Sequence, residues 1–190
     1  MKDILSGREV FAITRFSSEQ RIELEKRGFQ IFELRGESVA SLKMNGVGFW
    51  SNWHNGLEIE NERCKASEVA INVDDLFLPG SGGLTLQGQQ EMTKKYSQSL
   101  SQIIPGVKAI IGTALDYLDL DCGYTSKTNM SFFRRAGSYD NASTTTIGPG
   151  ENYLYVGRSF NGLPLVAYRP GKTSNSDVRV LPIIVPANYI

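Results

Sequence analysis

His54, the single histidine of the sequence, and three closely spaced aspartates are the side chains best suited to acid–base chemistry. His54 lies in the aromatic stretch WSNWHNG, and the aspartates Asp116, Asp119 and Asp121 lie in DYLDLD. A histidine within hydrogen-bonding reach of a carboxylate can act as a general base, so an enzyme that uses His54 with Asp116 or Asp119 is one hypothesis. A buried histidine in a purely structural role is the simpler interpretation.

Metal binding and thiol chemistry are the next activities to consider. The DYLDLD carboxylates lack the spacing of an EF-hand loop, and Leu118 and Leu120 alternate with them as in a strand. Cys64 and Cys122 have no CxxC or Cys/His zinc pattern around them. This favours free buried thiols, although a disulfide between the two stays open. The sequence therefore predicts no metal, no cofactor and no catalytic residue.

Two segments resemble sites for phosphate groups. FLPGSGGLTLQ, residues 77–87, precedes a predicted helix, but it lacks the GK[ST] ending of a P-loop and the GxGxxG spacing. SFFRRAG places Arg134 and Arg135 beside phenylalanines, as in proteins that stack on single-stranded nucleic acid. Twenty basic and twenty acidic residues give no net charge, which argues against a nucleic-acid partner. We expect a flexible turn at the first segment and, at SFFRRAG, a strand that buries the aromatics and exposes the arginines.

The C-terminal third is rich in residues that form contact surfaces. Of the 55 residues from 123 to 177, 30 are Gly, Ser, Thr, Asn or Tyr. Tyrosine supplies a large contact area at low entropic cost, while Ser, Asn and Gly adapt their hydrogen bonds to a ligand. A polar loop on a β-rich domain would have the same composition, so composition alone leaves both interpretations open.

A closing hairpin is the element that must position these residues. Asn161–Gly162 separates YLYVGRSF from LPLVAYR, and both turn residues tolerate the positive φ of a tight hairpin. Pro170–Gly171 predicts a second turn. Strand alternation places Tyr153 and Tyr155 on one face. The apolar run VRVLPIIV, residues 178–185, is typical of a buried strand that anchors the hairpin to the core.

The rest of the chain predicts a mixed scaffold. SSEQRIELEKRG has a helix cap at Ser17 and a helix stop at Gly28, and a longer helix runs from Thr85 to about Ile103 before Pro105–Gly106. FQIFEL, KASEVAINV and VKAIIG are predicted strands. After Leu120 no helical pattern is evident, so strands and long loops are expected there.

Length and composition favour one α+β domain over residues 1–190. Hydrophobic residues make up 41% of the chain and charged residues 21%. We expect residues 1–120 to form the scaffold, with two main helices, and residues 121–190 to form a strand-and-loop region for ligand display. MKDILSGREVFAITRF lacks the apolar stretch of a signal peptide, and no segment has the length of a membrane span. Cytoplasmic synthesis is therefore expected, with the final location open. Zero net charge favours self-association, so a homo-oligomer is a further expectation.

Residues 132–186 resemble the C-terminal region of C-type-lectin-like variable proteins associated with diversity-generating retroelements. FFRRAGS, YVGRSFNGLPL and VRVLPIIVP carry the resemblance. In that family, adenine-directed mutagenesis changes codons in this region, and Asn, Tyr, Ser, Asp and Thr are common products. The resemblance implies a C-type-lectin-like fold that displays variable side chains. The EPN and WND motifs of calcium-dependent lectins are absent. Cys64 and Cys122 precede the matching segment, which argues against formylglycine-generating activity.

The resemblance favours a non-catalytic binding protein for an unidentified protein or other macromolecule. A structural or assembly protein, such as a virion or surface-complex component, is the alternative. Eight residues, which we call the candidate contact residues, are predicted to share one exposed patch: Tyr153, Tyr155, Asn161, Tyr168, Arg169, Asn175, Ser176 and Asp177.

Overall fold

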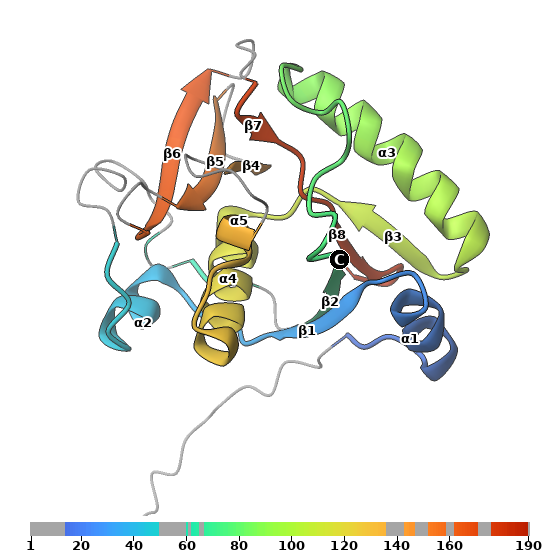
Figure 1. The fold of residues 1–190 in the computed structure, drawn as a ribbon, viewed down its shortest axis with the longest axis horizontal. Helices are drawn as coiled ribbons and strands as arrows, with labels where there is room; N and C mark the ends of the chain where they lie inside the picture. The colour runs from blue at the N-terminus through green and yellow to red at the C-terminus, as the bar shows by residue number, and fades with distance from the viewer. Residues whose placement is uncertain are drawn as a thin grey trace, which may run out of the picture.

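The computed structural model describes residues 14–49, 60, 62–64, 67–135, 143–146, 152–158, 162–170 and 176–189. The described helices are α1 (Ser18–Glu25), α2 (Val39–Met44), α3 (Leu86–Ile103), α4 (Ala114–Thr128) and α5 (Phe132–Arg135). The strands are β1 (Gln30–Leu34), β2 (Ser67–Ile71), β3 (Val107–Ile110), β4 (Ser143–Thr146), β5 (Asn152–Arg158), β6 (Pro164–Pro170), β7 (Val178–Arg179) and β8 (Ile183–Pro186). They form two sheets, ordered β1–β2–β8–β3 and β6–β5–β4–β7 (Figure 1). The predicted α+β class is confirmed.

The sheet β1–β2–β8–β3 is covered on both faces. Val69 and Ile71 of β2 belong to the core shared with α4 and the second sheet, whereas Ala70 between them packs with residues of α1 and α3. In β8, Val185 belongs to the core shared with α4 and the second sheet, and Ile184 packs with residues of α1 and α3. Because side chains alternate along a strand, this double burial requires apolar residues at successive positions. The sheet is therefore the middle layer, with α3 on one side and α4 on the other (Figure 1).

The helices α1 and α3 confirm their sequence predictions. Ser17 and Gln20 form a capping box at the start of α1, and Gly28 has a φ of 80° just after the helix. The side chain of Thr85 accepts a hydrogen bond from the Gly88 amide and caps α3. Local capping chemistry, which depends on adjacent residues, is enough to set both helix starts.

Helix α4 corrects the prediction of a strand at DYLDLD and of strands alone after Leu120. Thr113 and Asp116 form a capping box that starts the helix, and Asn129 ends it in the left-handed conformation. Every residue from Ala114 to Asp121 is buried, because the helix lies between the two sheets and packs against β1 and β5. These first two turns are covered on all sides and have no exposed polar face, so their sequence lacks the usual amphipathic pattern.

The segment SFFRRAG is also helical at its centre, which corrects the predicted strand. Phe132 and Phe133 begin the short helix α5 and are 0% and 2% exposed. Their rings lie 4.5 Å apart, and Phe132 also makes an edge contact with Tyr124 of α4. The prediction that the aromatics are buried is confirmed, and the side chains of Arg134 and Arg135 lie outside the description.

The C-terminal run completes the core, as predicted, but it forms two short strands in different sheets. β7 pairs in parallel with β4, and β8 then lies between β2 and β3, antiparallel to both. The apolar side chains of this run are at most 2% exposed: Val178, Val180, Leu181, Ile183, Ile184 and Val185. The last strand therefore occupies a central position in the first sheet.

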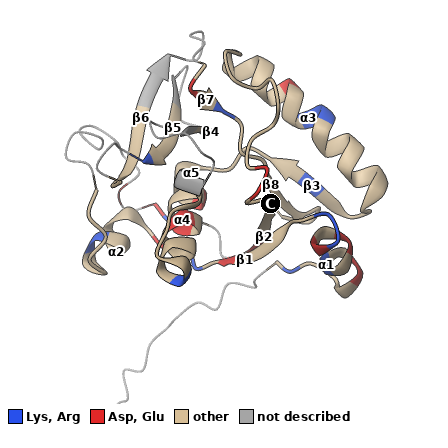
Figure 2. Ribbon diagram, viewed as in Figure 1, with Lys and Arg blue, Asp and Glu red and all other residues tan. Residues whose placement is uncertain are grey.

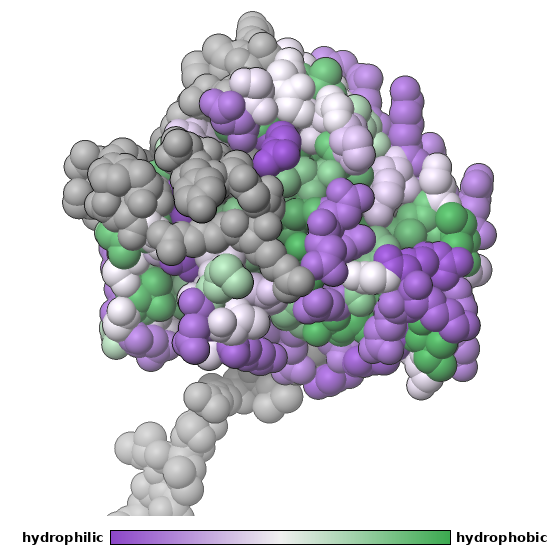
Figure 3. Space-filling model, viewed as in Figure 1, coloured by the Kyte–Doolittle hydropathy of each residue, from purple (hydrophilic) through white to green (hydrophobic). Residues whose placement is uncertain are grey.

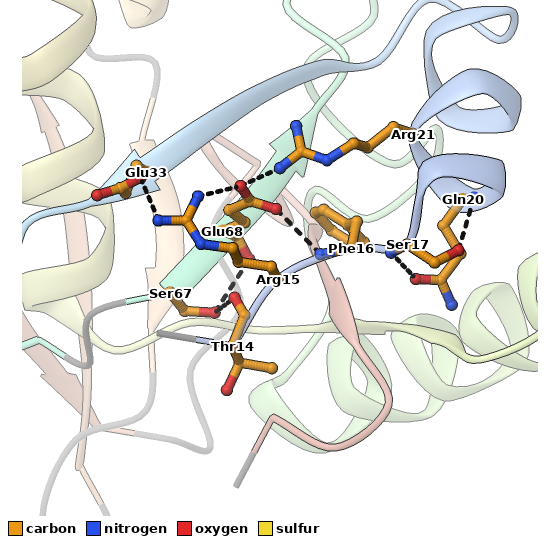
Figure 4. A network of polar contacts seen from close by, with 9 residues as sticks. All are labelled: Thr14, Arg15, Phe16, Ser17, Gln20, Arg21, Glu33, Ser67 and Glu68. Atoms are coloured by element: carbon orange, nitrogen blue, oxygen red, sulfur yellow. Dashed lines mark hydrogen bonds and ion pairs between the residues drawn. The ribbon is translucent and has the colours of Figure 1, made fainter. Parts of the chain in front are cut away.

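A buried glutamate fixes the segment that precedes α1 (Figure 4). The carboxylate of Glu68 accepts hydrogen bonds from the Phe16 amide at 3.0 Å and from Arg15 Nη1 at 3.0 Å, and it also pairs with Arg21 of α1. The carbonyl of Thr14 accepts from the Glu68 amide at 2.9 Å. Two guanidinium groups and one backbone amide offset the cost of burying this charge. The network has a structural role.

Candidate functional site

The hairpin β5–β6 carries four of the candidate contact residues on paired strands. Its register runs from Asn152 opposite Pro170 to Arg158 opposite Pro164, which confirms the predicted hairpin. Tyr153 stands opposite Arg169, and Tyr168 stands opposite Leu154. Gly162, between the strands, has a φ of 76°, as the turn prediction requires.

The structure describes the side chains of three candidate contact residues. Ser176 and Asp177 are exposed, and the hydroxyl of Ser176 donates a hydrogen bond to Asp177 Oδ1 at 3.1 Å. Tyr155 is half-buried against the main core. For Tyr153, Tyr168 and Arg169 the description stops at the backbone, and Asn161 and Asn175 lie outside the described residues. The single exposed patch therefore stays a prediction.

The second sheet places Ser176 and Asp177 on the far side of β4 from the hairpin. They precede β7, whose Val178 pairs with Ser143 of β4, which in turn pairs with Gly157 of β5. Residues 176–177 therefore lie at the same end of the sheet as the C-terminal end of β5, which leads to Gly162. Tyr153 lies four residues back along β5, roughly 13 Å at the rise of a strand. The candidate contact residues therefore span the sheet.

The 176–180 segment rests on the loop before α3. Gln89, which is buried, donates from Nε2 to the carbonyls of Ser81 at 2.9 Å and Val178 at 3.0 Å. The Ser81 hydroxyl accepts from the Val180 amide at 3.0 Å. A Cβ on Gly82 would lie 2.6 Å from the carbonyl oxygen of Ser176, so only glycine permits this approach. The glycine-rich FLPGSGGLTLQ segment is thus a support for β7, and this contact accounts for at least one of its glycines.

Arg158 joins the hairpin to helix α4. Its Nε donates to Asp121 Oδ2 at 2.7 Å, Nη2 donates to Thr125 Oγ1 at 3.0 Å, and Nη1 donates to the carbonyl of Gly162 at 2.6 Å. The Arg158 side chain is 14% exposed and that of Asp121 is 4% exposed. One guanidinium group therefore sets the distance between the α4 helix and the β5–β6 turn.

Asp121 is the electrostatic centre of this network. Burial raises the pKa of Asp121, while the charge of Arg158 and hydrogen bonds from Ser131 and the Phe132 backbone lower it in part. The Ser131 hydroxyl donates to the second carboxylate oxygen at 2.7 Å. Sequence reasoning considered Asp121 only as a metal ligand and did not assign Arg158 a role, because no local pattern joins residues 37 positions apart.

The other two DYLDLD carboxylates are engaged separately. Asp119 accepts from the Arg35 amide at 2.6 Å, from Arg35 Nε at 3.1 Å and from the Cys64 thiol at 3.2 Å. Asp116 accepts from the Thr113 amide at 2.7 Å and so completes the cap of α4. These contacts give both residues structural roles. His54, their partner in the enzyme hypothesis, lies outside the described residues, so that hypothesis stays open.

The two thiols are held in the protonated state. Burial raises the pKa of Cys64 far above the usual value, and the charge and hydrogen bond of Asp119 raise it further. Burial and the charge of Asp121 raise the pKa of Cys122 to about 12. Since the thiolate is the reactive form, neither cysteine is set up as a nucleophile. Both are free thiols, as the sequence favoured.

Charges and apolar groups are dispersed over the described surface. Acidic and basic residues are interspersed among the elements (Figure 2), and the three aspartates of α4 are buried. On the face in Figure 3, apolar residues occur in small groups among polar ones. The exposed large hydrophobic residues in the described ranges are Ile22, Met44, Ile103 and Met130, on different elements.

The described ranges contain neither a metal-binding cluster nor a membrane-spanning helix. Within those ranges, no group of three or more His, Cys, Asp or Glu side chains is arranged to hold a metal ion. None of the described helices combines the length and the apolarity needed to cross a bilayer.

Comparisons with protein-family models, with curated proteins and with solved structures found no match for this chain. The α+β class therefore rests on the structure alone. The C-type-lectin-like arrangement and the relation to retroelement variable proteins stay predictions from the sequence resemblance.

Proposed function

We propose that this chain is a non-catalytic binding protein that displays the candidate contact residues on a C-type-lectin-like scaffold. Its ligand would be a protein or another macromolecule. The display surface consists of the β5–β6 hairpin, its turn, and the segment from residue 171 to 177. Variation of these side chains, as in the retroelement-associated family, would change the ligand and leave the scaffold in place.

The contact of Arg158 with Gly162 is the observation that carries the proposal. A binding loop gains affinity when it is held in position before the ligand arrives, because less conformational entropy is lost on binding. Arg158, which is paired with buried Asp121, binds the carbonyl of Gly162. Gln89 and Ser81 bind the backbone of Val178 and Val180, in and next to β7. Both fixed points lie next to candidate contact residues.

The backbone pairing supports tolerance of side-chain change. The hairpin strands are joined along seven residue pairs, and Leu154, Val156 and Val166 anchor them in the core with at most 1% exposure. None of these anchors is a candidate contact residue. Substitutions at exposed contact positions should therefore change stability by roughly 0.5 kcal/mol or less each.

The experiment compares the wild-type chain with two variants of matched charge. The display variant carries Tyr153→Ala, Arg169→Ala, Ser176→Ala and Asp177→Ala. The control variant carries Glu91→Ala, Lys95→Ala, Gln98→Ala and Gln102→Ala, all at exposed positions of α3. Each variant loses one acidic and one basic group. Tagged wild-type protein first captures candidates from source cells and neighbouring cells, and each candidate is then purified.

Binding of a purified candidate, measured by surface plasmon resonance, decides the outcome. We expect the control variant to bind like wild type and the display variant to bind at least about 30-fold more weakly, the effect of losing one hot spot of about 2 kcal/mol. Both variants should melt within a few degrees of wild type. Equal binding by the display variant would contradict the proposed surface. Ordered self-assembly without any such ligand would favour the structural alternative.

A further inference from the structure

In the described residues, a buried charge pair links the end of β5 and Gly162 to helix α4. Arg158 is the last residue of β5, and its guanidinium group contacts both the Asp121 carboxylate and the Gly162 carbonyl. The pair is nearly closed to solvent, so water screens it weakly. Neutralising the carboxylate would leave the arginine charge buried beside neutral acceptors, which in the described residues are the Thr125 hydroxyl and the Gly162 carbonyl. That arrangement is unfavourable.

Asp121 stays in the interior whether or not Arg158 remains beside it. The helix α4 is buried along its first two turns, and the Ser131 hydroxyl holds the other carboxylate oxygen. Among the described residues, the groups around the carboxylate are Arg158 from β5, Ser131 and the Phe132 amide from the start of α5, and Cys122 and Thr125 from α4 itself.

Among the described residues, Cys122 is another titratable neighbour of this pair on α4. The pKa of the Cys122 thiol is raised to about 12, so the thiol stays neutral. On the β1 side of α4, the cation Arg35 is bound by Asp119, which is a separate pair. Among the described residues, Asp121 is the carboxyl group that is hydrogen-bonded to Arg158, so its protonation is the change that acts directly on the pair.

Thermodynamic reciprocity gives the direction of the pH effect. Arg158 lowers the pKa of Asp121, so removal of Arg158 from a carboxyl that remains buried must raise that pKa further. Release of Arg158 is then accompanied by proton uptake, and protonation must favour release by the same factor. If Asp121 instead became solvated on opening, the sign would reverse, and its fixed place in α4 is what excludes that case.

We propose that the Arg158–Asp121 pair is an acid-sensitive switch that holds Arg158 and Gly162, the described ends of the β5–β6 connection, against α4 at neutral pH and releases them on acidification, while both sheets remain folded. Burial raises the pKa of Asp121, which moves the change towards neutral pH. The switch does not depend on the binding role proposed above, since it is measured on the hairpin itself.

Hydrogen exchange of the wild-type chain between pH 7.5 and pH 4 tests the switch. Exchange of peptides covering residues 157–167 is measured by mass spectrometry and corrected for intrinsic rates. We expect their protection to fall by up to about tenfold per pH unit, the slope of one linked proton. Peptides of β2, β3 and β8 should keep their protection. Constant hairpin protection, or parallel loss in all peptides, would overturn the proposal.

Matched variants separate the switch from general destabilisation. Asp121→Asn should show low hairpin protection at every pH with no acid response. Asp119→Asn, which removes the other arginine-paired aspartate of α4, should keep the acid response of the hairpin. An acid response retained in Asp121→Asn would contradict the assignment. If that variant does not fold, the carboxyl pKa of Asp121 is measured by carbon NMR in wild type and in Arg158→Gln. A value that does not rise in Arg158→Gln would also refute it.

Discussion

Substitution of Tyr117 by phenylalanine should destabilise the chain far more than the loss of one oxygen atom suggests. Tyr117 is 0% exposed, and its hydroxyl accepts from the Gly112 amide at 3.0 Å and donates to the Leu181 carbonyl at 2.7 Å. Gly112 follows β3 and Leu181 lies between β7 and β8, so one hydroxyl links α4 to both segments. Phenylalanine fills the same volume but leaves a buried N–H group and a buried carbonyl without this partner.

The expected loss of stability follows from the Gly112 amide and the Leu181 carbonyl, which would both lose a hydrogen bond. Each unsatisfied buried group costs about 1–3 kcal/mol, and phenylalanine recovers part of this through its lower desolvation cost. We therefore expect the free energy of unfolding to fall by about 2–4 kcal/mol. For a chain of this length, that change lowers the melting temperature by about 4–16 °C.

Urea denaturation followed by far-ultraviolet circular dichroism measures the change, with Tyr96→Phe as the control. Tyr96 of α3 is half-buried, and its substitution should change the free energy of unfolding by about 0.5 kcal/mol or less. The slope of free energy against urea should be the same in all three proteins, because the area exposed on unfolding is unchanged. A Tyr117→Phe variant as stable as Tyr96→Phe would refute the role assigned to the hydroxyl.

Three further predictions test the C-terminal run, the α3 loop and the thiols. Truncation after Gly171 removes the buried residues of β7 and β8 and should give an insoluble or unfolded chain; a soluble product with a cooperative melt would contradict this. Gly82→Ala should cost about 1–3 kcal/mol in chemical denaturation, because its Cβ would overlap a backbone carbonyl. Gly123→Ala, where the Cβ meets open space within a helix, should instead stabilise the chain by up to about 1 kcal/mol. Cys64 and Cys122 should resist iodoacetamide at pH 8 until urea is added, because their raised pKa values leave almost no thiolate; rapid labelling of the native chain, read by mass spectrometry, would show otherwise.

Elements defined by local chemistry were predictable from the sequence. The cap at Ser17, the cap at Thr85 and the turn glycine Gly162 each depend on neighbouring residues, and the structure has all three in the expected conformations. The alternating strand at KASEVAINV was also recognisable. In each case the signal and the structure it specifies lie within a few residues of each other.

Helix α4 was not predictable in the same way, because tertiary packing decides its state. The alternation of Asp119 and Asp121 with leucines matches a half-exposed strand, yet both aspartates are buried. Asp119 pairs with Arg35, just after β1, and Asp121 pairs with Arg158 of β5. A buried carboxylate looks like a solvent-facing residue until its partner is known. The candidate site was unpredictable for the same reason. Arg158 and Asp121, which link the hairpin to α4, are far apart in the sequence and meet only in the folded structure.

The central position of β8 has a consequence for folding during synthesis. Residues 183–186 separate β2 from β3, so the first sheet has a gap at its centre until they have emerged from the ribosome. Before then, β2 and β3 expose unpaired strand edges, which invite aggregation and chaperone binding. Pairings between such distant segments also slow folding, because a long loop must close first. We therefore expect the first sheet to form only after residues 183–186 have emerged. Ribosome-stalled chains that end before residue 183 should be sensitive to protease along most of their length.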